Sequence, residues 1–259
     1  MDPLIGRWLC NEAEYLRILS EVTSSPMEED DEVLMASMRG THPFFNEALI
    51  KDASAAPSRS SLWTMESFYR RHDQPYMVHA CCTPDPARFR KVMSDNGYAL
   101  EAINTAMAVN ASTLNPVPRP SGVRLRPVGT SEDLMRFCRT ACRGNELPPS
   151  LEEELVRLMS GIDPRSASRL TPFIAERGNE SVATSVLLES VDCGVYFVST
   201  VPEERGRGIG AWLTYETVRR GLSDDCRSTF VEASPAGCSM YRRLGFTDIA
   251  LADEYVKLR

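Results

Sequence analysis

The amino-acid sequence predicts an α/β protein, more closely an α+β arrangement in which helices cover a mixed β-sheet. Segments with the two-residue alternation of strands are interspersed with segments of helical periodicity, which is typical of a sheet covered on both faces. A run of three prolines and a glycine within residues 112–122 interrupts regular structure and marks a domain boundary. We therefore expect one domain over residues 1–120 and a second over residues 121–259.

The first domain is expected to mix helices and strands. Periodicity and turn signals predict helices over residues 11–20, 27–38 and 86–93, and strands over residues 76–80 and 98–100. The acidic run Glu28–Glu32 suits the first turn of a helix, because carboxylates there interact favourably with the helix dipole. Asp85 is in position to cap the helix that follows it.

The second domain has a clearer pattern, in the order β-α-α-β-β-β-α-β-α-β. Strands are predicted over residues 123–126, 171–176, 181–189, 195–201, 229–233 and 255–258, and helices over residues 131–142, 150–159, 208–222 and 239–244. Ser131 is the expected cap of the first helix. In the second helix Leu151, Leu155 and Leu158 form one apolar stripe.

Composition and charge narrow the function classes. The net charge of −7 argues against a nucleic-acid backbone as the main partner. The first residues lack the basic and apolar regions of a signal peptide, and no stretch approaches the roughly 18 to 20 apolar residues of a membrane span. We expect a cytoplasmic protein without a membrane partner, with its eight cysteines reduced.

Histidines and cysteines do not predict a metal site. His72, His79, Cys81 and Cys82 lie close together in the sequence, but their spacing fits no zinc pattern. We therefore expect no metal.

A glycine-rich turn carries the most specific chemical signal. The predicted strand over 195–201 leads through Pro202 into a glycine-rich turn, and a helix is predicted directly after it. The turn reads Arg205-Gly206-Arg207-Gly208-Ile209-Gly210. Glycines let backbone N–H groups approach an anion, and a helix N-terminus adds unpaired donors and the positive end of its dipole. Arginines suit phosphate. The pattern predicts a pyrophosphate site, although glycines alone are also typical of a tight turn.

The identity of the pyrophosphate ligand depends on a second motif. A Walker loop needs Gly-Lys-Ser/Thr, and the dinucleotide fingerprint needs GxGxxG; the chain has neither. About thirty residues after the loop comes Tyr241-Arg242-Arg243-Leu244-Gly245-Phe246. With these two motifs in this order, the segment 195–246 resembles the GNAT superfamily of N-acetyltransferases. The element order extends the resemblance over residues 123–259.

The resemblance implies acetyl-CoA as co-substrate and assigns the residues that bind it. In that superfamily the strand before the loop separates from its neighbour at a bulge, and the gap receives the pantetheine arm. The matching cofactor-binding positions are Val198, Ser199 and Thr200 in the strand, and Arg205, Gly206, Arg207, Gly208, Gly210 and Ala211 at the pyrophosphate. Ser234 lies where many relatives carry an asparagine that contacts pantetheine; serine is shorter and departs from that pattern.

The resemblance also implies catalytic roles. Tyr241 falls where the family usually places the general acid that protonates the departing thiolate. The alternative for this tyrosine is packing in the core. Relatives often use a glutamate on a central strand, or a water chain, to accept the proton of the amine. Glu189 and Glu232 are the candidates, and either can instead be a surface carboxylate.

The first domain carries no catalytic motif. Thr41-His42-Pro43-Phe44-Phe45-Asn46 and the segment from Pro84 to Tyr98 resemble the amino-terminal region of GNAT proteins in which a degenerate half precedes the active one. The expectation is a tandem GNAT fold. His42, Phe44 and Phe45 are candidates for substrate contact; core packing of the aromatics is the alternative.

The function expected from the resemblance is transfer of acetyl from acetyl-CoA to a primary amine of a small molecule, by a monomer or homodimer. One alternative is a coenzyme A-binding sensor or scaffold without turnover. Another is an acyltransferase that uses a different acyl-CoA.

Overall fold

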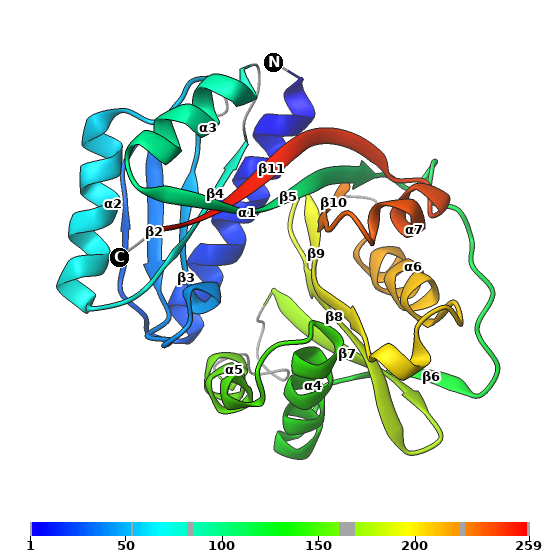
Figure 1. Cartoon of the computed structure of the whole chain (residues 1–259). Coiled ribbons are helices and arrows are strands. Elements are labelled where there is room, and N and C mark those ends of the chain that lie inside the picture. The colour runs from blue at the N-terminus through cyan, green and yellow to red at the C-terminus, as the bar shows by residue number, and fades with distance from the viewer. Residues whose placement is uncertain (1, 53, 82–84, 161–168, 223–225, 258–259) are drawn as a thin grey trace. The chain divides into compact units, whose positions relative to one another are not determined.

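The computed structural model describes residues 2–52, 54–81, 85–160, 169–222 and 226–257 and divides into two compact units (Figure 1). Unit 1 comprises Met1–Met107, Glu232–Cys238 and Asp248–Arg259, and unit 2 comprises Ala108–Val231 and Ser239–Thr247. This division differs from the predicted boundary at residue 120. The end of the chain joins unit 1 by strand pairing, which a reading of the sequence in order does not reveal.

Unit 1 contains a mixed sheet in the order β1-β2-β3-β4-β11-β5. Its elements are α1 (Pro3–Val22), β1 (Met27–Glu29), β2 (Val33–Ser37), η1 (Pro43–Phe45), β3 (Asn46–Ile50), α2 (Arg59–His72), β4 (Met77–Cys81), α3 (Pro86–Asp95), and most of β5 (Tyr98–Val109) and β11 (Thr247–Lys257). Strands β3 and β4 are parallel, whereas β11 is antiparallel to β4. The helices predicted from residues 11 and 86 are therefore confirmed, and Asp85 caps α3 as expected.

The two faces of this sheet differ in character. Figure 1 shows α1 and α2 on opposite sides of strands β2 to β4. Val78, Ala80 and Tyr255 belong to an apolar core with side chains of α2 and α3. Because side chains alternate along a strand, the neighbours His79 and Glu254 point to the other face, on the side of α1.

The helix predicted over residues 27–38 is wrong. This segment is the hairpin of β1 and β2, in which Met27 pairs with Ala36. Asp30 Oδ1 accepts hydrogen bonds from the backbone N–H groups of Glu32 and Val33, at 2.8 Å each, and so shapes a turn. The acidic run therefore marks a hairpin tip, since aspartate can favour a turn as readily as a helix start. Helix α2 and strand β3 were not predicted from the sequence.

Unit 2 contains a sheet in the order β10-β9-β8-β7-β6. Its elements are β6 (Val123–Pro127), α4 (Ser131–Gly144), η2 (Pro149–Leu151), α5 (Glu152–Met159), β7 (Leu170–Arg177), β8 (Glu180–Leu188), β9 (Cys193–Thr200), η3 (Pro202–Glu204), α6 (Ile209–Gly221), the start of β10 (Thr229–Ala233), and α7 (Cys238–Arg243), most of which belongs to this unit. The predicted order of elements is confirmed. The cap of α4, however, is Thr130 and not Ser131: the Thr130 hydroxyl accepts from Asp133 N at 3.1 Å.

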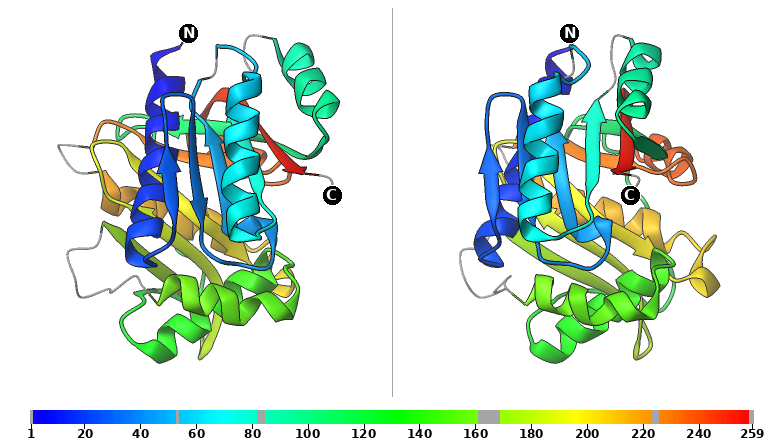
Figure 2. Two further views of the ribbon diagram at one scale, coloured as in Figure 1. Left: turned by 90° about the vertical axis from the view of Figure 1, so that its left-hand side faces the viewer. Right: turned by 60° about the vertical axis from the view of Figure 1, so that its left-hand side comes forward.

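Helices cover both faces of the sheet in unit 2. Figure 2 shows α4 and α5 on one side of strands β7 to β9 and α6 on the other. Neighbouring residues of β8 show the same alternation. Ser185 hydrogen-bonds Thr217 of α6 at 2.7 Å, whereas Thr184 hydrogen-bonds Ser199 on β9 at 2.7 Å. Ser199 lies against the end of α4, where a Cβ on Gly144 would be 2.5 Å from its hydroxyl.

The cysteines of the described residues form no disulfide. Cys10 is exposed and the other six are buried; Cys82 lies outside the described residues. None of the helices in the described part of the chain is long and apolar enough to cross a membrane.

Candidate functional site

Strands β9 and β10 diverge in unit 2. They are parallel and pair at Thr229 with Cys193 and at Phe230 with Gly194. Beyond these pairs β9 continues to Thr200, and no further pairing joins the two strands in the described residues. Val198, Ser199 and Thr200 of β9 therefore lie beyond its pairing with β10.

A bulge bends β9 on its other side, where it pairs with β8. Thr184 pairs with Ser199 and Val186 with Tyr196, so Phe197 and Val198 face a single residue of β8. Phe197 has φ +49°, a left-handed conformation that is rare for a large side chain. The Thr184 hydroxyl donates to the carbonyl oxygen of Phe197 at 2.9 Å and fixes this geometry. The predicted bulge before the loop is present, and its strained residue, Phe197, is one that the sequence analysis did not single out.

The glycine-rich turn connects β9 to α6 with an open helix start. Gly206 and Gly208 both have φ +75°, and no atom lies within 4 Å of where their Cβ would be. Gly208 is the N-cap of α6, and no side chain among the described residues caps this end. Gly210 allows a close approach, since a Cβ there would be 3.0 Å from the Thr200 hydroxyl. This arrangement leaves the first N–H groups of a thirteen-residue helix and the space in front of them suited to an anion.

The two arginines of the loop have different environments. The guanidinium of Arg205 donates to the carbonyl oxygens of Thr200 and Gly144, at 3.1 and 2.7 Å, and contacts Glu146 at 2.6 Å. It therefore holds the loop against the end of α4. Arg207 is half-exposed and lies 3.5 Å from Glu204. The pyrophosphate role of Arg205 stays a prediction, and its three protein partners point to a structural role.

Tyr241 lies on α7, one of the elements of unit 2, and only 5% of its surface is exposed. Its ring meets that of Phe246 edge to face, with centroids 5.5 Å apart. Gly245 ends the helix with φ +95°, and a Cβ there would lie 1.9 Å from the carbonyl oxygen of Thr113. The Tyr-x-x-Leu-Gly-Phe motif is thus a tightly packed turn that fixes the tyrosine.

The comparisons with known proteins agree with these features. Residues 133–246 match the acetyltransferase (GNAT) family. They include the bulged strand, the glycine-rich loop and the tyrosine helix. Residues 133–246 form a GNAT acetyltransferase domain. Among curated proteins, none matches the chain.

Solved structures extend the likeness in fold to the whole chain. A GCN5-related N-acetyltransferase from Kribbella flavida superposes with a TM-score of 0.76 at 16% identity, over 100% of this chain and 97% of the other. A functionally unknown conserved protein from Staphylococcus epidermidis gives 0.67 at 11% identity, over 91% and 94%. A tandem GNAT protein from the clavulanic acid biosynthesis pathway gives 0.57 at 13% identity, over 97% and 94%. The chain therefore has a GNAT-like α/β fold with a mixed sheet.

The remaining predicted residues occupy different places. Ser234 lies in unit 1, in the turn before α7; its side chain is exposed and its carbonyl oxygen accepts from Gly237 N at 2.9 Å. Glu189 is exposed beyond the end of β8, next to Arg169, whose carbonyl accepts its N–H at 2.8 Å. Since Ala183 of β8 pairs with Thr200 and Leu188 with Gly194, Glu189 lies at the opposite end of this pair of strands from the glycine-rich loop.

Glu232 belongs to a group of ionisable side chains in unit 1. It is two residues past Phe230, the last residue of β10 that pairs with β9. Glu232 interacts with His79 (β4), Asn104 (β5), Glu254 (β11) and Glu12 (α1). Glu12 in turn interacts with Glu47 (β3), and Tyr15 (α1) interacts with both Glu12 and Glu47. We call this set the acidic cluster. Apart from Glu232 and His79, the members of this cluster were not singled out from the sequence, because no spacing in one chain segment links five strands and a helix.

The pKa values of several side chains in the acidic cluster differ strongly from the ordinary values of those groups. Burial, followed by the charge of Glu232, raises the pKa of Glu12 to about 8. Burial raises the pKa of Glu232 to about 7, and Glu254 raises it while His79 and Asn104 lower it. Burial alone would lower the pKa of His79, but Glu47, Glu232 and Glu254 together raise it to about 9. The perturbed groups gather on one face of the sheet, which is typical of a functional site.

Of the four residues that were weighed as a metal site, His72 and His79 lie on opposite faces of the sheet. His72 lies at the end of α2 and packs edge to face on Phe68, on the face of the sheet away from His79. His79 instead approaches Glu232 and Glu254, with one ligand atom of each within 4.8 Å of the others. The candidate substrate-contact residues belong to η1: His42 caps it, Phe44 is partly buried and Phe45 is buried in the core.

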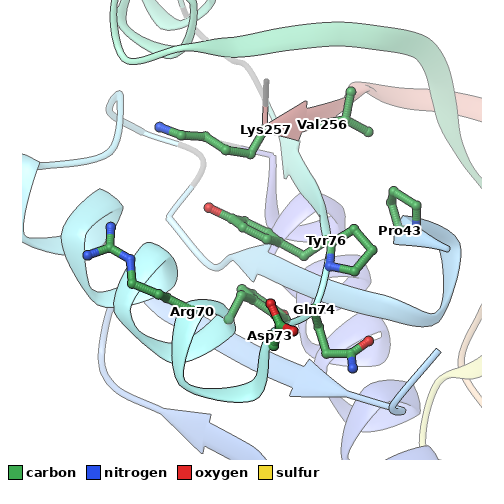
Figure 3. A pocket seen from close by; sticks show the side chains of 9 residues that line it. Pro43, Arg70, Asp73, Gln74, Tyr76, Val256 and Lys257 are labelled. Atoms are coloured by element: carbon green, nitrogen blue, oxygen red, sulfur yellow. The ribbon is translucent and has the colours of Figure 1, made fainter. Parts of the chain in front are cut away.

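A hollow in unit 1 has a volume of about 400 Å³ and is lined by residues that include Arg70, Asp73, Tyr76 and Lys257 (Figure 3). Its lysine is already neutralised. Lys257 Nζ donates to Glu66 at 2.6 Å and to the carbonyl oxygen of Asn96 at 2.6 Å. The same ammonium lies 4.4 Å from the centre of the Tyr98 ring. These contacts give the lysine a structural role.

Proposed function

We propose that the GNAT domain transfers an acetyl group from acetyl-CoA to a primary amine of a small molecule. The observation that carries this proposal is the divergence of β9 from β10 directly before a glycine-rich turn that opens α6 without a side-chain cap. An extended thioester can lie along a strand edge while its diphosphate meets the helix start.

The described residues fit coenzyme A in two ways. The open space in front of Gly206 and Gly208 accommodates phosphate oxygens, and the N–H groups of Ile209, Gly210 and Ala211 at the helix start can donate to them. The edge of β9 at Val198, Ser199 and Thr200 offers backbone groups to the amides of pantetheine. Arg207 adds a positive charge at the loop surface.

In the proposed reaction the amine nitrogen attacks the thioester carbonyl carbon directly. A C–N bond forms, the C–S bond breaks, and negative charge develops first on the carbonyl oxygen and then on the leaving sulfur. A backbone N–H on the edge of β9 would stabilise the oxygen, which is worth about 3 kcal/mol in comparable sites. Tyr241 would donate its phenolic proton to the thiolate.

Glu189 and Glu232 stay the two candidate bases of the proposed reaction, and they differ in their environments. A general base works best when its pKa lies near the working pH. Burial brings the pKa of Glu232 to about 7, whereas Glu189 is exposed to solvent. Glu232 lies two residues past Phe230, the last residue of β10 that pairs with β9, and belongs to unit 1.

Two measurements test the proposal. Isothermal titration calorimetry with acetyl-CoA should show binding, and release of free thiol should accelerate when a suitable primary amine from a panel is added. Absence of heat with both coenzyme A and acetyl-CoA would contradict the proposal at its first step.

The alternatives give different results in the same assays. A sensor or scaffold would bind acetyl-CoA tightly while no amine accelerates thiol release. An acyltransferase of different specificity would release thiol faster from propionyl-, malonyl- or succinyl-CoA than from acetyl-CoA.

A further inference from the structure

Two buried cysteines of unit 2 lie next to each other where β9 and β10 begin. Cys193 is the first residue of β9 and pairs with Thr229, the first residue of β10. The carbonyl oxygen of Ser228 accepts the backbone N–H of Cys193 at 2.9 Å and the thiol of Cys226 at 3.4 Å. Both cysteines belong to the same apolar core, and their thiols are hydrogen-bonded to each other. We call Cys193 and Cys226 the thiol pair.

The surroundings of the thiol pair make its two members chemically unequal. Cys193 is 1% exposed, and its hydrogen bond with Cys226, followed by burial, raises its pKa. Cys226 is 8% exposed, and the hydrogen bond from Cys193 outweighs burial and lowers its pKa. The Thr229 hydroxyl, which is buried and has no other hydrogen-bond partner among the described residues, lowers it as well. Cys226 is therefore the member that becomes a thiolate more readily, and Cys193 is the one that stays protonated and donates.

A second pair of cysteines in unit 2 has a different environment. Cys138 and Cys142 lie one turn apart on α4, and burial raises the pKa of both thiols. Both stay protonated near neutrality, and a protonated thiol is a poor nucleophile. This pair therefore provides an internal comparison for the reactivity of the thiol pair.

We propose that a peroxide oxidises Cys193 and Cys226 to a reversible disulfide, which closes residues 193–226 into a loop. That loop contains β9, the glycine-rich turn and α6, the elements of the candidate coenzyme A site in unit 2. Because a cross-link restricts the unfolded chain, the disulfide should stabilise this segment against unfolding. The inference is independent of acetyl transfer, since it concerns only the two thiols and their oxidant.

The oxidation balances with hydrogen peroxide as the only co-reactant. The Cys226 thiolate attacks one peroxide oxygen, the O–O bond breaks, and a sulfenic acid forms on the sulfur while the leaving hydroxide takes up the proton of the thiol as water. The Cys193 sulfur then attacks the Cys226 sulfur, the S–O bond breaks, and the hydroxyl leaves as a second water with the proton of Cys193. Two sulfurs are oxidised and two peroxide oxygens are reduced, so two thiols and one peroxide give one disulfide and two waters.

Oxidation also removes a hydrogen bond at one end of α6. The Cys193 thiol donates to the carbonyl oxygen of Gly221, the last residue of α6, at 3.2 Å. A disulfide has no proton to donate, so this contact is lost. The glycine-rich turn precedes the other end of the same helix, so we expect the affinity for coenzyme A to change little.

The first experiment maps the cross-link in the native full chain. Tryptic cleavage places Cys193 and Cys226 in separate peptides, residues 178–205 and 221–227, and neither peptide contains another cysteine. After exposure of the folded protein to hydrogen peroxide and alkylation of the remaining thiols, mass spectrometry should find these two peptides joined. Dithiothreitol should separate them again.

The same digest contains the comparison. Cys138 and Cys142 fall in the peptides 137–139 and 140–143, which should be recovered alkylated and unlinked. Recovery of Cys193 and Cys226 as alkylated, unlinked residues would overturn the inference. A cross-link between them that forms only in denaturant would overturn it too. This map needs no variant, so it does not depend on whether a substituted chain folds.

The second experiment separates the roles of the two thiols. Cys226→Ser should leave Cys193 unoxidised, whereas Cys193→Ser should stop at a sulfenic acid on Cys226, which a dimedone probe traps. Cys138→Ser, at another buried cysteine of unit 2, is the matched control and should keep the cross-link. A dimedone adduct on Cys193 in Cys226→Ser, with none on Cys226 in Cys193→Ser, would overturn the assignment.

Thermal unfolding measures the effect of the loop closure. Peroxide treatment should raise the unfolding midpoint of the native chain and of Cys138→Ser by roughly 10 °C, and dithiothreitol should reverse the rise. Neither Cys193→Ser nor Cys226→Ser should show it. A cross-linked native chain whose midpoint does not rise would overturn the stabilising role of the disulfide.

Discussion

At the scale of single residues, Tyr241 is buried and its orientation is fixed by Phe246 and by the turn at Gly245. If it protonates the leaving thiolate, Tyr241→Phe keeps the packing and removes the proton. We expect turnover to fall by roughly 10², with the dissociation constant of acetyl-CoA near its original value. Steady-state kinetics and calorimetry on the same preparation check this, and unchanged turnover would remove Tyr241 from the mechanism.

Two neighbouring arginines should respond differently to truncation. Arg205 bridges the loop to the end of α4 through three partners, so Arg205→Ala should lower the thermal unfolding midpoint. The contact of Arg207 with Glu204 is longer, at 3.5 Å, so Arg207→Ala should weaken coenzyme A binding and its salt dependence with little effect on the midpoint. Calorimetric titration at two salt concentrations, together with thermal unfolding, tests both variants. The reverse pattern would assign the pyrophosphate contact to Arg205.

At the scale of elements, the turn between β9 and α6 concentrates the binding function in backbone geometry. Gly208→Val should abolish coenzyme A binding, since a branched side chain at φ +75° strains the helix start and fills the space in front of it. Gly178→Val is the matched control: this glycine also has positive φ and open space, but lies in the β7–β8 turn. It should cost similar stability and leave binding intact. If Gly208→Val still binds coenzyme A, the loop is only a turn and does not form the binding site.

The contrast between local and distant features explains how far the sequence could predict this site. The strand, the glycine turn and α6 follow one another in the chain, and so do Leu244, Gly245 and Phe246, so their motifs were readable. The hairpin at Asp30 was misread because acidic residues suit both a turn and a helix start. His79 and Glu254 could not be linked, because only strand pairing brings them together.

At the scale of the whole molecule, the chain does not divide at a single point. The last strand, β11, pairs with β4 over Ala252–Val256, and Tyr255 belongs to the apolar core of unit 1. Arg90 of α3 meets the buried carboxylate of Asp253 at 2.7 Å. The residues that complete unit 1 therefore follow the GNAT domain in the chain. Glu254 is one of them, which is why it can belong to the acidic cluster.

The acidic cluster should make stability depend on pH in a definite direction. The pKa of Glu12 and of Glu232 is raised in the folded state, to about 8 and about 7, so both favour folding when protonated. His79, whose pKa is raised to about 9, contributes stability that is fully present at low pH and lost as the pH rises through this value. All three signs agree, and the free energy of unfolding should fall from about pH 5 to about pH 9.

This prediction is checked by thermal unfolding at constant ionic strength across that range. Glu29 has the opposite sign, but hydrogen bonding to Arg17 lowers its pKa to about 2, so its stability is lost only in more acidic solution. Glu12→Gln should flatten the dependence, because the substituted amide stays neutral throughout. Asp95→Asn, which breaks an exposed ion pair with Lys91 in the same unit, is the control and should not flatten it. A midpoint that rises with pH would mean that the carboxylates of the acidic cluster are ionised in the folded protein. Glu232 would then lack the raised pKa that suits it to accept a proton near neutrality.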